Sequence, residues 1–174
     1  VYTAVSLENF DLSSAIIGVL LKQSNRHLIE QLVNVNDSCG RCPAHHIVLS
    51  CQFLTRTSCI DDSVRRNAEK LHGRLMKTFL DAGLDPMKPD VHGATLVHYV
   101  ARAGLVSMLE LVLQSSNAKV DRQDHYGSTP LQCAMFANCT KTTEALLVRE
   151  CDSDIRMIKD CCGRTAADIA SLLG

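Results

Sequence analysis

Apolar residues recur at helical spacing in several parts of the chain. Residues 12–21 and 27–33 form two short patterns of this kind, joined by a polar segment, and predict a pair of helices. A longer stripe predicts one unusually long helix over residues 62–81. The apolar positions of this stripe are Ile60, Val64, Ala68, Leu71, Leu75 and Phe79.

A polar motif, D-x-x-G-x-T followed by small and apolar residues, recurs between the helical segments. It begins at Asp90, Asp124 and Asp160, and a fourth copy at Asp37 has Cys42 where Thr is expected. The last two intervals between copies are close to a 33-residue period, and the first interval is about 20 residues longer. The motif predicts stacked repeating units, because one such unit cannot bury its apolar face alone.

The extra length lies between the two helices of the second repeat, at about residues 52–70. Cys51 falls where the first helix should end, and residues 71–80 fall in the second helix. Residues 53–56 extend the first helix, so we expect a projecting pair of long helices. Two interpretations remain open: a tolerated surface insertion, or a contact site for a partner or for a second copy.

The repeated motif resembles the ankyrin repeat, and the segments Thr129-Pro130-Leu131 and Phe79 to Asp85 match that family's pattern well. The resemblance covers roughly residues 28–174. It implies an all-α ankyrin-repeat solenoid of stacked helix–turn–helix units with β-hairpin loops, about four or five repeats, and the long helical insertion in the second repeat.

The resemblance also implies one domain over residues 1–174. Its parts are an atypical first repeat (1–36), a repeat with the insertion (37–89), two regular repeats (90–123 and 124–159) and a partial repeat (160–174). The start at Val1 suggests a fragment of a longer protein. His98 and His45 take the place of the histidine with which the family bridges neighbouring repeats, whereas Gln132 and Asp168 replace it and predict weaker bridging.

Ankyrin-repeat proteins usually bind other proteins through turn tips and the concave face of the first helices. The resemblance therefore implies a non-catalytic protein–protein interaction module, acting as a scaffold, adaptor or inhibitor of a signalling or transcription protein. Residues 85–93 and the irregular repeat lengths are also similar to IκB-like inhibitors of the NF-κB pathway. The expected contact residues are Val91, His92, Arg102, Gln123, His125, Tyr126, Ser128, Phe136, Lys159 and Arg164.

Two other functions fit the same pattern. The apolar stripe and the short last repeat favour self-association, through the long helices or through an end of the stack. The other function is that of a regulatory domain of a larger enzyme, channel or transcription factor. It stays open because fold alone does not define function.

Composition narrows the compartment and the partners. The chain has 18 basic and 19 acidic residues, so it lacks the positive patch expected for nucleic-acid binding. Its apolar runs are too short to span a membrane. Nine cysteines, an odd number without an even framework, predict reduced thiols in the cytoplasm or nucleus.

Candidate chemistry is sparse. We find no nucleophile, phosphate-binding or metalloprotease motif, and we expect no enzyme activity, no cofactor and no metal. His72, His92 and His125 are isolated and are predicted to lie at the surface. Cys161 and Cys162 are adjacent, and are either ordinary thiols or a redox pair. A second group of possible metal ligands lies in the second repeat: Cys39, Cys42, His45, His46, Cys51 and Cys59. A zinc site is the alternative interpretation of this group, although the repeat register predicts that His45 points inward.

Overall fold

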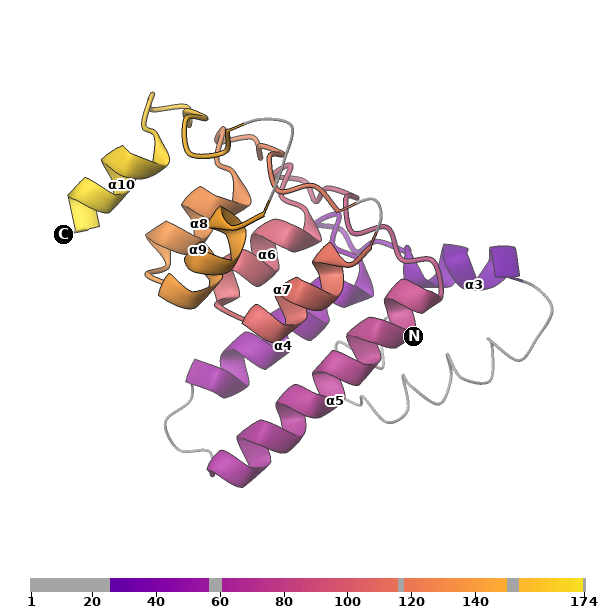
Figure 1. Cartoon of the computed structure of the whole chain (residues 1–174). Coiled ribbons are helices and arrows are strands. Elements are labelled where there is room, and N and C mark those ends of the chain that lie inside the picture. Colours follow the sequence, from indigo (N-terminus) through magenta and orange to yellow (C-terminus); the bar gives the residue numbers. More distant parts are fainter. Residues whose placement is uncertain (1–25, 57–60, 116–117, 150–153, 174) are drawn as a thin grey trace. The chain divides into compact units, whose positions relative to one another are not determined.

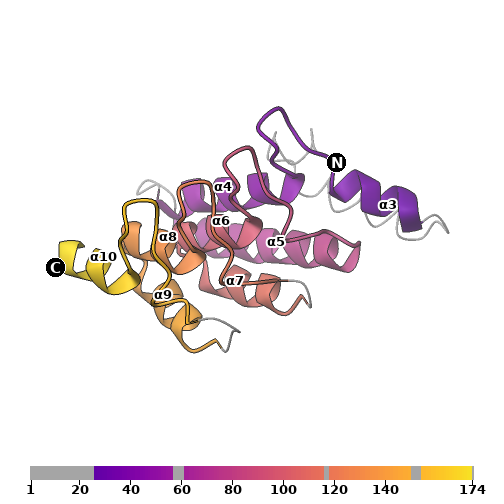
Figure 2. The ribbon, with the colours of Figure 1, turned by 90° about the horizontal axis from the view of Figure 1, so that it is seen from above.

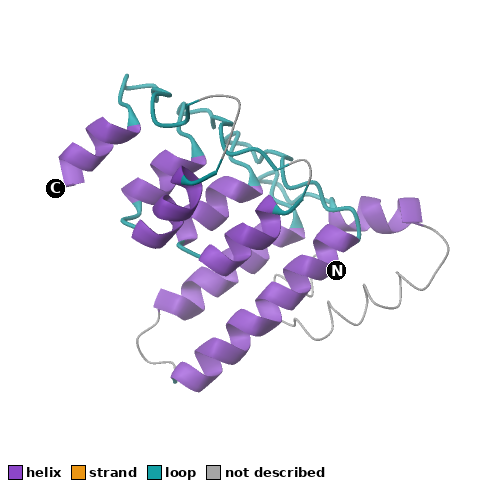
Figure 3. Cartoon of the chain, viewed as in Figure 1, coloured by secondary structure: helices purple, strands orange, loops and turns teal. Residues whose placement is uncertain are grey.

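A computed structural model describes residues 26–56, 61–115, 118–149 and 154–173 (Figure 1). These residues contain eight helices and no strand (Figure 3). The chain divides into two compact units, residues 1–85 and 86–174. The helix predicted over residues 12–21 lies outside the described residues.

The first unit contains α3 (Arg26–Val33), α4 (Pro43–Arg56) and α5 (Asp62–Asp81). The long helix predicted over residues 62–81 is confirmed with the same bounds, and so is the extension of the helix before it. A carboxylate oxygen of Asp61 accepts a hydrogen bond from the backbone N–H of Ser63 and caps α5. Helices α4 and α5 pack against each other, and their buried apolar side chains include Ile47, Val48, Cys51, Leu75, Met76 and Phe79.

The buried face of α5 differs from the predicted stripe at one turn. His72 is fully buried, and its ring nitrogens lie near the carbonyl oxygen of Ala68 and the hydroxyl of Ser50. The prediction of a surface histidine was therefore wrong. Leu71 is instead 39% exposed. The buried positions 72, 75, 76 and 79 are three or four apart and so form one helix face, and position 71 lies at the edge of this face.

The second unit contains α6 (Leu96–Ala103), α7 (Val106–Leu113), α8 (Pro130–Phe136), α9 (Thr140–Leu147) and α10 (Ala166–Leu173). In this unit α8 packs against both α6 and α10, while α7 packs on α6 and α9 packs on α8 (Figure 2). One layer thus holds α6, α8 and α10, and the other holds α7 and α9. The buried side chains between these helices include Leu96, Val97, Val100, Leu109, Val112, Leu131, Leu146 and Ile169.

The predicted β-hairpin loops are tight turns in the described residues, so that part of the prediction was wrong. Each turn is closed by a backbone bond such as the one from the Asp90 N–H to the Ala94 carbonyl (2.9 Å). Neighbouring turns are joined by one backbone hydrogen bond, such as the one from the His125 N–H to the His92 carbonyl (2.8 Å). A strand needs a ladder of alternating bonds, and these turns are too short to form one.

Candidate protein-binding surface

The aspartate of each motif holds its turn in place. One carboxylate oxygen of Asp90 accepts the backbone N–H groups of His92 and Ala94 at 2.8 and 2.9 Å. Asp124 and Asp160 make the same two bonds in their own turns, and Asp37 does so in the first unit. The aspartate therefore fixes the backbone at the tip of each turn. Because the bonds come from backbone N–H groups, they place no requirement on the side chains that follow the aspartate.

The environments of Asp90 and Asp160 favour the charged form of these two carboxylates. Burial by itself would raise the pKa of Asp90, but hydrogen bonds from the Tyr99 hydroxyl and from two backbone N–H groups hold that pKa below its ordinary value. Sequence reasoning missed Tyr99, whose hydroxyl donates to Asp90 at 2.7 Å. For Asp160, the bond from the Arg164 side chain has the largest influence and lowers the pKa.

At the tips of the first two turns of the second unit, the side chains between the aspartate and the glycine of the motif point outward. Val91 and His92 are exposed on the first tip, and His125 and Tyr126 are exposed on the next, with Tyr126 58% exposed. The rings of His92 and Tyr126 stack with their centroids 6.3 Å apart. The fold therefore brings together contact residues that lie 34 positions apart in the sequence.

Phe136, at the end of α8, meets Arg164 of the following turn. The guanidinium carbon of Arg164 lies 5.0 Å from the centre of the half-exposed Phe136 ring, a distance typical of a cation–π contact. Arg164 also forms a 2.7 Å ion pair with Asp160. Arg102 on α6 packs in the same way over Tyr99, at 5.1 Å.

Two expected contact residues have roles inside the turns. Gln123 is exposed, but its amide donates to the carbonyls of Gly127 and Lys159 and so joins two turns. Lys159 itself is exposed. Ser128 is only 9% exposed, which corrects the prediction that it lies on the contact surface. Its backbone carbonyl accepts a hydrogen bond from His98 of the preceding repeat.

The bridging histidine behaves as predicted in the first regular repeat. His98 Nδ1 accepts the Thr95 N–H at 3.1 Å, which leaves Nε2 to donate to the Ser128 carbonyl at 3.1 Å. Burial lowers the pKa of His98 and so favours its neutral ring in the folded protein.

The weaker bridging predicted at Gln132 was wrong. Its Nε2 donates to the carbonyls of Ile158 (3.1 Å) and Arg164 (2.9 Å), while its Oε1 accepts the Thr129 N–H. An amide nitrogen carries two hydrogens where a neutral imidazole offers one, so glutamine makes one more bond across the interface.

The cluster of cysteine and histidine in the first unit is split between surface and core. Cys39 lies exposed on a tip, whereas Cys42 and His45 are buried, as the register predicted for His45. The Cys42 sulfur lies 3.1 Å from His45 Nδ1. Cys59 falls outside the described residues, and within those residues no group of three metal-ligating side chains comes together.

Comparison with known proteins defines the class. The family model for ankyrin repeats, in three copies, matches residues 66–159, and because this is more than half of the chain, the protein belongs to the ankyrin-repeat family. The predicted resemblance is thereby confirmed. Ankyrin repeats are protein–protein interaction modules, and this chain contains one.

Two curated proteins of Arabidopsis thaliana are similar to parts of the chain. Serine/threonine-protein kinase 12 is 38% identical over 61 residues, which cover 35% of this chain and 13% of the kinase. The E3 ubiquitin-protein ligase KEG is 29% identical over 118 residues, which cover 66% of this chain and 7% of the ligase. The chain thus spans a small part of either relative.

The length and apolarity of a helix decide whether it can cross a membrane. None of the helices between residues 26 and 173 that the structure describes is long and apolar enough to cross a bilayer.

Proposed function

We propose that this protein is a non-catalytic interaction module that binds a partner protein through the turn tips and first helices of residues 86–174. The observation that carries the proposal is the exposed group formed by Val91, His92, His125 and Tyr126 on two hydrogen-bonded tips. Tyrosine and arginine are the residue types that most often anchor protein interfaces.

The rigidity of the tips supports this role. The backbone beneath Tyr126 is held by Asp124, and the next turn is joined to it by the bond from the Cys161 N–H to the Tyr126 carbonyl. A surface that is already ordered loses little conformational entropy when it binds. The carboxylates of the motif are engaged in these backbone bonds, which supports a structural rather than a catalytic use for them.

Within this class we propose a scaffold, adaptor or inhibitor of a signalling or transcription protein, located in the cytoplasm or nucleus. The similarity to parts of a kinase and of a ubiquitin ligase supports a related role as a regulatory domain within a larger enzyme. We further propose one stack of about four or five repeats with the boundaries given by the sequence motif. The likeness to IκB-like inhibitors stays a prediction.

Self-association is the second candidate, and exposed apolar side chains favour it. Phe53 on α4 and Leu71 on α5 are exposed in the first unit, and Leu172 and Leu173 are exposed on α10 in the second. A groove of about 400 Å³ lies between α8, α9 and α10, and its lining includes Met135, Thr143 and Leu173.

The test is affinity capture from cell extract, followed by a direct binding measurement on the captured partner. The bait is the wild type beside the variant Arg102→Glu/Tyr126→Ala/Phe136→Ala. A matched control, Lys141→Glu/Leu147→Ala/Val148→Ala, makes one charge reversal and two apolar truncations at exposed residues of α9 and at the residue that caps its C-terminus. Circular dichroism confirms that both variants fold.

We expect the first variant alone to weaken partner binding, by tenfold or more, since loss of one interface anchor typically costs about 2 kcal/mol. Equal binding by all three proteins would contradict the proposed surface. A molar mass that rises with concentration, without any captured partner, would instead support self-association.

A further inference from the structure

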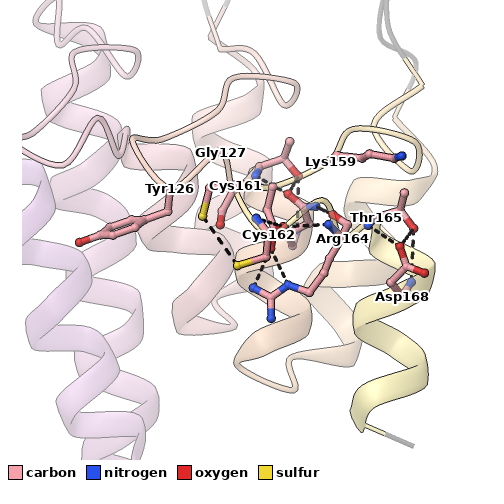
Figure 4. A network of polar contacts seen from close by, with 12 residues as sticks. Tyr126, Gly127, Lys159, Cys161, Cys162, Arg164, Thr165 and Asp168 are labelled. Atoms are coloured by element: carbon pink, nitrogen blue, oxygen red, sulfur yellow. Dashed lines mark hydrogen bonds and ion pairs between the residues drawn. The ribbon is translucent and has the colours of Figure 1, made fainter.

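Two neighbouring cysteines form a feature that partner binding does not explain. Cys161 and Cys162 are both exposed at the tip of the last described turn, and their sulfur atoms lie 3.9 Å apart (Figure 4). Adjacent cysteines often point in different directions, but here the two side chains approach each other.

The backbone of this turn is fixed on both sides of the pair. The Cys161 N–H donates to the Tyr126 carbonyl at 2.9 Å, and the Cys162 N–H donates to a carboxylate oxygen of Asp160 at 2.9 Å. The Gly163 N–H donates to the Asp160 carbonyl, and Arg164 pairs with the Asp160 side chain. The two thiols are therefore oriented in advance, and a ligand that binds both need not reorganise the backbone.

The distance between the sulfur atoms defines what fits. A disulfide bond is about 2.05 Å long, so at 3.9 Å the thiols are not bonded to each other. Bonds from thiolate sulfur to a soft acceptor such as zinc are about 2.3 Å long. The sulfur separation is less than twice this length, so one acceptor atom can bond to both sulfurs.

The number of donors selects the kind of acceptor. A structural zinc ion needs four ligands, and no third histidine, cysteine or carboxylate joins a metal-binding group with these thiols within the described residues. A trivalent organoarsenical needs only two sulfurs, because its organic substituent occupies the third bond. We propose that Cys161 and Cys162 form a two-thiol binding site for trivalent arsenicals, a role that is independent of partner binding.

The reaction requires no oxidant or reductant. An arsenical R–As=O gains two As–S bonds and loses its oxygen, which leaves as water together with the two thiol protons, while arsenic remains trivalent. A protonated Cys161 thiol is consistent with this stoichiometry, and the hydrogen bond with Cys162 is the main reason that the pKa of Cys161 is raised.

The other described cysteines are poorer sites. Burial raises the pKa of both Cys51 and Cys133 to about 12, and Cys42 is buried. Cys39 is exposed. When two bonds form to one probe, the second is intramolecular and can raise the overall affinity about 10²- to 10⁴-fold.

The test uses phenylarsine oxide and the whole folded protein. The adduct is challenged with excess glutathione, a monothiol, and then with 2,3-dimercaptopropanol, a dithiol. Free thiols are afterwards blocked with N-ethylmaleimide under denaturing conditions. Trypsin cleaves after Lys159 and Arg164, so residues 160–164 form one peptide that carries both cysteines and can be weighed by mass spectrometry. The variants are Cys161→Ser and Cys162→Ser, with Cys39→Ser as an exposed control.

We expect one adduct on the peptide of residues 160–164 that survives glutathione and is removed by the dithiol. Each serine variant of the pair should lose this adduct and bind the probe about 10²- to 10⁴-fold more weakly, while Cys39→Ser retains it. The proposal is overturned if glutathione removes the adduct from the wild type. It is equally overturned if the adduct lies on residues 42–56 or 123–141, or persists in Cys161→Ser. Circular dichroism of each variant excludes unfolding as the cause of a loss.

Discussion

At the scale of single residues, the side chain three positions after the threonine of the motif influences how neighbouring repeats are joined. His98, Gln132 and Asp168 each accept the N–H of the threonine that starts the helix. His98 and Gln132 also donate to carbonyls of the next repeat, whereas an ionised aspartate has no hydrogen to donate. The chemistry of this residue thus sets how firmly one repeat is joined to the next.

The difference between histidine and glutamine predicts a pH effect. Burial lowers the pKa of His98 and so favours its neutral form, an effect that the hydrogen bond to the Ser128 carbonyl and the nearby carboxylate of Asp124 only partly offset. The unfolded chain takes up a proton near the ordinary pKa of about 6.5, so the stability that His98 contributes is complete above this pH and decreases as the pH falls below it. At pH 5.5 the loss reaches at most about 1.4 kcal/mol.

Because glutamine does not titrate, His98→Gln should keep the free energy of unfolding within about 1 kcal/mol of the wild type at pH 7.5. It should lose less stability than the wild type between pH 7.5 and 5.5. Urea denaturation followed by circular dichroism at the two pH values measures both quantities. Identical losses in the two proteins would show that His98 is not the titrating group.

At the scale of elements, the turns depend on glycines in the left-handed backbone region. Gly127 and Gly163 have nearly the same φ, +72° and +75°, but different surroundings. A Cβ atom at Gly127 would lie 2.8 Å from the Cys161 nitrogen and 3.1 Å from backbone atoms of Asp160, whereas one at Gly163 would meet nothing within 4 Å. Alanine substitutions at these two glycines therefore distinguish two costs: the backbone strain within a turn, and the packing of one turn against the next.

We expect Gly163→Ala to destabilise the protein by about 1–2 kcal/mol, the cost of a left-handed conformation for a residue with a Cβ atom. Gly127→Ala should cost a further 1–3 kcal/mol or so, because the backbone of the adjacent turn must move. Urea denaturation of the two variants provides the comparison. Equal losses would mean that the neighbouring turn yields freely and that the contact between turns contributes little.

At the scale of the whole molecule, the same carboxylate recurs in both compact units and makes the fold sensitive to acid. Burial would raise the pKa of Asp37, but hydrogen bonds from Arg41 and His46 lower it below the ordinary range. The pKa values of Asp90 and Asp160 are lowered as well. For a lowered carboxylate pKa, the stabilisation is complete above the unfolded value of about 3.9 and is lost as the pH falls through the folded value.

Asp90→Asn tests this contribution. At pH 7 we expect it to lower the free energy of unfolding by about 1.5–3 kcal/mol, the range for hydrogen bonds to a charged group. As the pH is lowered from 5 to 3, the difference from the wild type should shrink below about pH 4, because the unfolded wild-type chain then takes up a proton that the folded Asp90 carboxylate, with its lowered pKa, resists. Denaturation curves over this pH range give the difference directly; a constant difference would refute the electrostatic origin.

The sequence by itself determined the features whose interactions are local. The motif predicted the positions of the four turns that begin at Asp37, Asp90, Asp124 and Asp160, because its aspartate bonds to N–H groups two and four residues later, and its glycine supplies a positive φ. Helical periodicity predicted α5 with its observed bounds, since helical hydrogen bonds span only four residues. The candidate surface could likewise be assigned to the tips from the register of the motif alone.

Only the tertiary structure decided which side chains meet across repeats. The stacking of His92 on Tyr126, the contact of Arg164 with Phe136 and the second bridging bond of Gln132 all join residues far apart in the sequence. The burial of His72 and Ser128 has the same origin, because exposure depends on what the neighbouring elements cover. Such contacts are set by how helices and turns pack, and the order of residues along one repeat does not contain that information.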